Sequence, residues 1–175
     1  MTGPPTRLLR AKVVMLGAPS VGKTSLVRRF VHSVFNDGYR STLGVKVDRK
    51  TVNLPEASVA MLLWDIHGEA EGLAIPRNYL RSVSAAINVF DASRLDTAAV
   101  AGELSQRVLE ASPAVQVFAA ANKSDLAVDW DGADAAAAAA GLDVPRRLSA
   151  KEDSGVDELF NDIATALFEN APTTS

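Results

Sequence analysis

A glycine-rich octapeptide, GAPSVGKT at residues 17–24, constrains the fold of this chain more than any other stretch. It follows residues 12–16, an apolar run typical of a buried strand, and it leads into residues 23–32, whose apolar positions recur at helical spacing. The backbone N–H groups of such a turn, with the N-terminus of the following helix, form a pocket for phosphate oxygens. The sequence therefore predicts a strand–turn–helix unit that binds phosphate.

Apolar runs and helical patterns alternate along the rest of the chain, which predicts an α/β fold. Strands are expected at residues 45–54, 58–65, 85–90, 115–121 and 146–148. The first two of these form an antiparallel hairpin around a short turn. Helices are expected near residues 76–81, 97–111, 133–140 and 156–167. The prediction is a six-stranded, mostly parallel sheet with one antiparallel strand and about five helices.

The composition is that of a globular protein. The 175 residues carry 18 basic and 21 acidic side chains, a near balance that argues against nucleic acid as the main partner. The absence of cysteine excludes disulfides, thiolate metal sites and lipids attached through cysteine. No apolar run reaches the roughly 18 residues of a membrane span. A cytoplasmic monomer with no direct membrane anchor is expected.

A second motif, NKSD at residues 122–125, follows a predicted buried strand at the edge where open α/β sheets bind ligands. The Asp125 carboxylate can accept hydrogen bonds from both N1–H and the 2-amino group of guanine. Adenine lacks both donors and would leave a buried carboxylate unpaired. Asn122 can brace the loop, and the stem of Lys123 can lie against the base. Together the two motifs predict binding of a guanine nucleotide.

Five motifs in order make the chain resemble the small GTPases of the Ras superfamily over about residues 10–169. They are GAPSVGKT, TLG at 42–44, WDIHG at 64–68, NKSD, and SAK at 149–151. The stretches STLGVKV and WD are most similar to the Rab branch. The resemblance implies a three-layer G domain of the P-loop NTPase class at residues 10–170, with flexible segments at 1–9 and 171–175.

The resemblance also implies ligands and partners. Mg²⁺ and GTP or GDP would be bound, and two switch loops would meet effectors and GTPase-activating or exchange proteins. The implied metal ligands are Thr24, Thr42 and, through water, Asp65. The implied nucleotide contacts are Gly17, Ala18, Pro19, Ser20, Val21, Gly22, Lys23, Thr24, Ser25, Phe35, Thr42, Asp65, Gly68, Asn122, Lys123, Asp125, Ser149, Ala150 and Lys151.

Several of these residues have specific implied roles. Lys23 would add a charge at the β- and γ-phosphates, and the backbone N–H of Gly68 would read the γ-phosphate. Phe35 would lie edge-on to guanine, and the N–H of Ala150 would complete the base pocket. With Glu69 in the position of the usual glutamine, the expected catalytic groups are Glu69, Lys23 and Gly68.

The chain departs from the family pattern in ways that bear on function. Pro19 lacks an N–H and can crowd the approach of an activating arginine. His67 and Glu69 replace the small residue and the catalytic glutamine of the second switch. The loop after Gly68 lacks the common aromatic residue, and the chain has no cysteine for a prenyl group. A prokaryotic Rab-like protein, broadly similar to the gliding-polarity GTPases, is therefore expected.

Three functions stay open on the sequence alone. The first is a GTP-binding switch that hydrolyses GTP slowly. The second is a pseudo-GTPase held in one nucleotide state, which Glu69, His67 and Pro19 favour. The third is a P-loop kinase or ATPase, which the NKSD motif disfavours.

Overall fold

The computed structural model describes residues 7–35, 44–66 and 75–172. These residues contain six strands, four α-helices and one 3₁₀ helix, η1. The elements in chain order are β1 (Leu8–Leu16), α1 (Lys23–His32), β2 (Val45–Asn53), β3 (Ser58–Ile66), η1 (Arg77–Leu80), β4 (Ala85–Asp91), α2 (Asp96–Ala111), β5 (Gln116–Asn122), α3 (Trp130–Ala139), β6 (Arg146–Arg147) and α4 (Val156–Glu169).

All six strands form one sheet in the order β2–β3–β1–β4–β5–β6. β1 pairs in parallel with β3 and β4, and β5 pairs in parallel with β4 and β6. β2 pairs antiparallel with β3. The predicted α/β class, the six-stranded sheet and its single antiparallel strand are confirmed.

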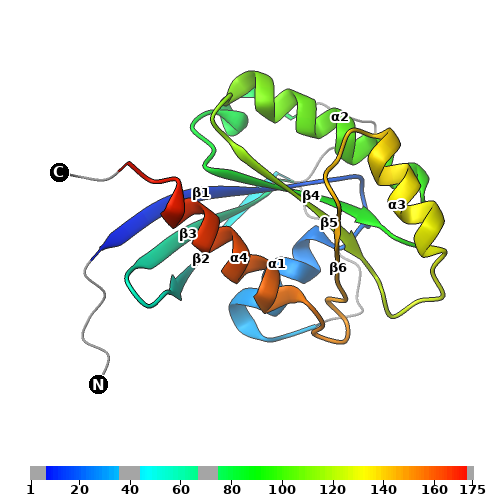
Figure 1. Ribbon diagram of the computed structural model, residues 1–175, viewed down its shortest axis with the longest axis horizontal. Helices are drawn as coiled ribbons and strands as arrows, with labels where there is room; N and C mark the ends of the chain where they lie inside the picture. Colours follow the sequence, from blue (N-terminus) through cyan, green and yellow to red (C-terminus); the bar gives the residue numbers. More distant parts are fainter. Residues whose placement is uncertain (1–6, 36–43, 67–74, 173–175) are drawn as a thin grey trace.

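Helices cover both faces of the sheet and make three layers (Figure 1). α1 and α4 share one face, where the rings of Phe30 and Phe160 stack with their centroids 3.8 Å apart. The opposite face carries α2, η1 and α3. Residues of β1 alternate between the two cores: Val13 belongs to the core under α1 and α4, and Val14 to the core under η1 and α2.

Three elements differ from the sequence prediction. α3 begins at Trp130, three residues before the expected start of this helix. β1 begins at Leu8, inside the segment expected to be flexible, and Leu8 and Leu9 pair with Ser58 and Val59 of β3. Exposed Arg10 breaks the apolar run there, because that part of the strand is not buried on both faces. The helix expected near residues 76–81 is a single 3₁₀ turn, so four α-helices are described where about five helices were predicted.

Candidate nucleotide-binding site

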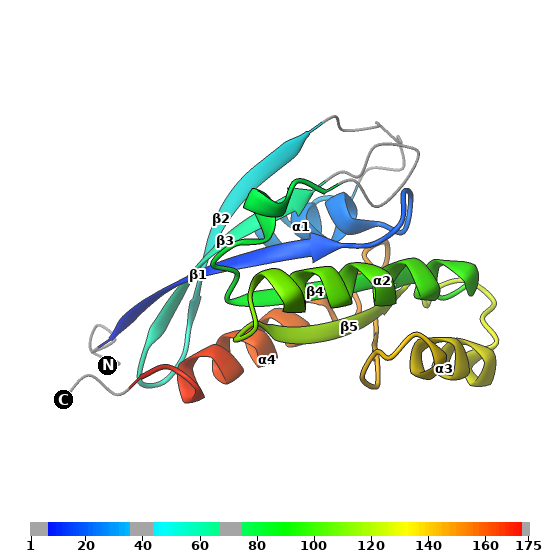
Figure 2. The same cartoon turned by 90° about the horizontal axis from the view of Figure 1, so that it is seen from above.

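The loops that carry the predicted motifs meet at one edge of the sheet. β1, β4 and β5 are parallel neighbours and end on the same side of the molecule (Figure 2). The glycine-rich turn follows β1, residues 92–95 follow β4, and the NKSD loop follows β5. This carboxyl edge is where ligands of open α/β sheets bind.

Two glycines allow the turn after β1 to pack closely on the neighbouring strands. A Cβ on Gly17 would lie 2.2 Å from the backbone oxygen of Val89 in β4. A Cβ on Gly22 would lie 2.2 Å from Nδ2 of Asn122, and Gly22 has a φ of +102°, which favours glycine. Both glycines of the motif are thus required by the packing of the turn.

Lys23 places its ammonium group inside the turn. The residue is 6% exposed, and Nζ donates to the backbone oxygens of Gly17 at 2.7 Å and Ala18 at 2.9 Å. Burial lowers the pKa of Lys23 to about 8, and the charge of Asp65 opposes this shift in part. A phosphate bound in the turn would stabilise the charged amine.

Thr24 and Asp65 bring two hard oxygen ligands together at the start of α1. The hydroxyl of Thr24 donates to Oδ2 of Asp65 at 2.5 Å, and Asp65 is fully buried near the end of β3. Mg²⁺ prefers such oxygen ligands and keeps several waters. Within residues 7–35, 44–66 and 75–172, no group of three or more His, Cys, Asp or Glu side chains could hold a metal. The pair therefore fits a Mg²⁺ ion that takes its remaining ligands from phosphate and water.

Asn122 joins the glycine-rich turn at residues 17–24, called the phosphate turn below, to the loop before α4. Its side chain is buried, and Nδ2 donates to the backbone oxygen of Val21 at 2.9 Å. Its Oδ1 accepts from the backbone N–H of Ala150 at 3.2 Å. The bracing expected of Asn122 is therefore present. Because the N–H of Ala150 donates to Asn122 here, its expected role toward the base stays a prediction.

The carboxylate predicted to read guanine is held next to the SAK motif. Asp125 is half-buried, and its Oδ1 accepts from the hydroxyl of Ser149 at 2.7 Å. The same hydroxyl accepts from the backbone N–H of Glu152 at 3.0 Å, which fixes its direction. Asp125 thus lies beside Ser149 of the SAK motif, and Lys151 of the same motif is exposed. Their contacts with a base stay predictions.

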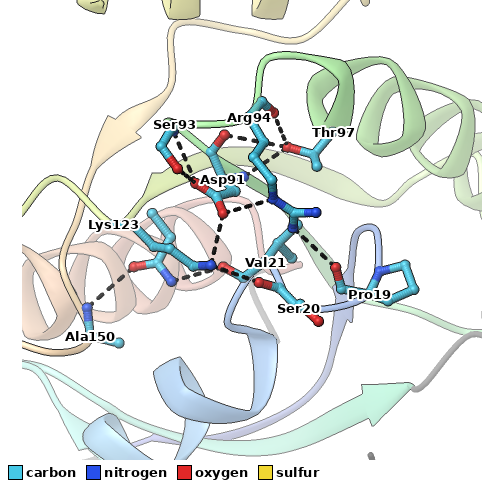
Figure 3. Close-up of polar contacts among 10 residues, drawn as sticks. Pro19, Ser20, Val21, Asp91, Ser93, Arg94, Thr97, Lys123 and Ala150 are labelled. Carbon is cyan, nitrogen blue, oxygen red and sulfur yellow. Dashed lines mark hydrogen bonds and ion pairs between the residues drawn. The ribbon is translucent and has the colours of Figure 1, made fainter. Parts of the chain in front are cut away.

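Asp91 forms a network that sequence reasoning missed (Figure 3). This residue ends β4 and is 1% exposed. Its Oδ2 accepts from Nζ of Lys123 at 2.7 Å and from Nε of Arg94 at 3.1 Å. Its Oδ1 accepts from the N–H and the hydroxyl of Ser93 at 2.9 and 2.6 Å. Burial alone would raise the pKa of Asp91, but the bonds from Lys123, Ser93 and Arg94 outweigh it and hold the pKa at about 2.

Both cations on Asp91 also bind the phosphate turn. Nζ of Lys123 donates to the backbone oxygen of Ser20 at 2.8 Å, and Nη2 of Arg94 donates to that of Pro19 at 3.2 Å (Figure 3). One signal for Asp91 was present in the sequence, because it directly follows a predicted buried strand. The structure pairs it with Asn122 of β5. Arg94 had no such signal.

Arg29 is a second residue that the sequence analysis missed. From α1, its Nε donates to the backbone oxygen of Ala150 at 2.8 Å and its Nη2 to that of Lys151 at 2.9 Å. Its guanidinium carbon also lies 5.9 Å from the ring centroid of Phe35. Arg29 therefore connects Phe35 with the SAK loop, and in the sequence it looked like an ordinary polar residue of an amphipathic helix.

The predicted switch residues are not placed by the structure. Thr42, His67, Gly68 and Glu69 lie outside the described residues. The other predicted contacts are described. Most gather around the turn after β1, the end of β3 and the loops after β5 and β6, whereas Phe35 follows α1 and lies against Arg29.

Asp91 is expected to make the stability of the protein depend on acid pH. Its folded pKa of about 2 lies below its ordinary value of 3.8, so its contribution is complete above that value and is lost as pH falls toward about 2. The free energies of unfolding in urea of the parent and of Asp91→Asn should therefore differ most near neutral pH and less at about pH 3. If the difference between these free energies stays constant over this pH range, the low pKa assigned to Asp91 is contradicted.

A comparison of the sequence with protein families finds a match. The model described as "Ras: Ras family" matches residues 12–169, which run from within β1 to the last residue of α4. The match includes the phosphate turn, Asp65, the NKSD loop and the SAK motif.

Proposed function

Because the chain belongs to the Ras family of GTP-binding switch GTPases, we propose that it binds Mg²⁺ and GTP at the carboxyl edge of its sheet and hydrolyses GTP slowly. The observation that carries the proposal is the side chain of Asn122. It joins the turn suited to phosphate and the loop suited to guanine through bonds of 2.9 and 3.2 Å. One ligand with both a base and a phosphate chain fits this arrangement.

The phosphate chain would bind in the turn at residues 17–24. Lys23 is buried there with its ammonium group directed to backbone oxygens, so a phosphate would give it an anionic partner. The N–H groups of the turn and the N-terminus of α1 would donate to phosphate oxygens.

The metal would bind beside Thr24 and Asp65. When bound, Mg²⁺ neutralises charge on the β- and γ-phosphates. Thr24 would offer its hydroxyl oxygen, and Asp65 would hold a water of the metal. Thr42 is proposed as a further ligand in the nucleoside triphosphate state.

Hydrolysis would depend on Glu69, which takes the place of the usual glutamine. A glutamine accepts a hydrogen bond from the attacking water and also donates one to the γ-phosphate. A carboxylate can only accept, and it adds negative charge close to an anionic phosphate. Glu69 can still orient the water or take its proton. Hydrolysis is therefore proposed to be slow, below about one turnover per minute.

Single-turnover hydrolysis tests this proposal against the pseudo-GTPase alternative. The parent, Glu69→Ala and Glu69→Gln are preloaded with GTP, and released phosphate is followed over hours. Glu69→Ala is expected to be slower than the parent, and Glu69→Gln to differ from it by less than about tenfold, or 1.4 kcal/mol in barrier. Absence of phosphate release from a parent that binds GTP favours the pseudo-GTPase. Equal rates for the parent and Glu69→Ala contradict the role of Glu69.

The partner surface is proposed to include the two switch loops and the β2–β3 hairpin between them. Val47 and Leu62 are 47% and 40% exposed on this hairpin, and the ring of Trp64 lies 6.1 Å from that of Tyr79. Effectors and regulators would bind here.

In the part of the chain that the structure describes, no helix has the length and apolar character needed to cross a membrane. Membership of the Rab branch stays a prediction.

A further inference from the structure

Three consecutive carbonyl groups of the phosphate turn are held by side chains from other elements (Figure 3). The oxygen of Pro19 accepts from Arg94, that of Ser20 from Lys123 and that of Val21 from Asn122. Lys123 and Asn122 belong to the NKSD motif, whereas Arg94 lies in the connection between β4 and α2. We propose that Arg94 is a positioning residue that orients the phosphate turn for the nucleotide, an inference that rests on the proposed function.

The planar peptide unit explains how Arg94 would act. In a trans peptide the C=O and the following N–H point in opposite directions. When Arg94 binds the oxygen of Pro19, the N–H of Ser20 must therefore point away from Arg94. The bonds from Lys123 and Asn122 direct the N–H groups of Val21 and Gly22 in the same manner. These N–H groups are the donors that a phosphate turn offers to its ligand.

Two features make the N–H of Ser20 depend on such support. Pro19 has no N–H, so the turn lacks one donor immediately before Ser20. Ser20 also has a φ of +64°, a left-handed conformation that is uncommon for residues other than glycine. Arg94 holds the peptide before Ser20 and Lys123 holds the peptide after it. Without Arg94, the peptide between Pro19 and Ser20 can rotate and turn its donor away from the phosphate.

Arg94 is itself held in place. Its Nε donates to Oδ2 of Asp91 at 3.1 Å, and Asp91 is buried and bound by Ser93 and Lys123. The planar guanidinium then fixes the direction of Nη2 toward Pro19. The side chain of Arg94 is 45% exposed, so its removal leaves little buried space. Its loss should therefore affect the orientation of the turn more than the stability of the fold.

The test compares the affinities of Arg94→Ala for GDP and GMP, measured by calorimetry on nucleotide-free protein with Mg²⁺. GDP binding is expected to weaken about tenfold and GMP binding to change by less than about twofold, because GMP lacks the β-phosphate. Arg94→Lys, which keeps a cation, should fall between the parent and Arg94→Ala. Arg107→Ala, an exposed arginine on α2, is the matched control and should behave like the parent.

The outcomes distinguish a failure of the inference about Arg94 from a failure of the proposed function. If Arg94→Ala binds GDP with an affinity within about twofold of that of the parent, the inference is overturned. An equal loss for GDP and GMP also overturns it, because it indicates a general disturbance of the fold. If Arg94→Ala does not fold, the same comparison is made with Arg94→Lys and Arg94→Gln. A parent that binds neither GDP nor GTP contradicts the proposed function instead.

Discussion

Asp125→Asn is expected to lower the affinity for GTP at least about a hundredfold and to raise the affinity for xanthosine triphosphate. The carboxylate can accept from two guanine donors, whereas the new amide turns one acceptor into a donor. A mismatch of this kind leaves buried polar groups unpaired, at a cost of about 3 kcal/mol or more where one of them is charged, which corresponds to at least about a hundredfold. Xanthine has an oxygen in place of the 2-amino group, and this oxygen can accept from the amide.

Calorimetry with GTP, ATP and xanthosine triphosphate measures these changes. Asp143→Asn is a suitable control, since Asp143 is an exposed carboxylate elsewhere on the surface. The parent should prefer GTP over ATP at least about a hundredfold. Equal affinities of the parent for GTP and ATP would contradict the assignment of Asp125 to the base. The bond from Ser149 to Asp125, at 2.7 Å, should survive the substitution because an amide oxygen also accepts.

Gly17→Ala is expected to destabilise the protein by about 3 kcal/mol. The added Cβ would lie 2.2 Å from the backbone oxygen of Val89 and 3.1 Å from a methyl group of Val21. Because Val89 lies in the central strand β4, its backbone cannot move without disturbing the pairing with β1 and β5. The end of β1 must shift instead, which also displaces the phosphate turn.

The free energy of unfolding in urea measures this effect. Gly141→Ala is the matched control, because no heavy atom beyond its two chain neighbours lies within 4 Å of the added Cβ. Gly141 has a φ of +73°, so its substitution should cost only the left-handed penalty of about 1–2 kcal/mol. If Gly17→Ala loses no more free energy of unfolding than Gly141→Ala, a small backbone shift removes the contact with Val89 and the prediction is wrong.

The sequence predicted those parts of the molecule that depend on local patterns. Buried parallel strands give apolar runs, so β4 and β5 were found nearly to the residue. The pattern failed at the start of β1, where Leu8 and Arg10 are exposed and Arg10 interrupts the apolar run. It also failed at residues 76–81, where a single 3₁₀ turn has no helical period.

The residues of the candidate site divide in the same way, into those that a local sequence motif predicts and those that only the fold identifies. The phosphate turn, the NKSD loop and the SAK motif were predicted because each has a recognisable local sequence. Arg29, Asp91 and Arg94 were not assigned, since their roles arise from elements far apart in the chain. The bond from Arg29 to Ala150, for example, joins residues 121 positions apart. Only the folded arrangement brings such residues together.

The network around Asp91 has a consequence for the lifetime of a bound nucleotide. Lys123 and Arg94 share this one carboxylate, and each binds a carbonyl of the phosphate turn. Outward movement of the base loop would therefore pull on the turn through these bonds. If a nucleotide binds as proposed, opening of the base loop would have to break several charge-assisted bonds, and slow spontaneous exchange is therefore expected.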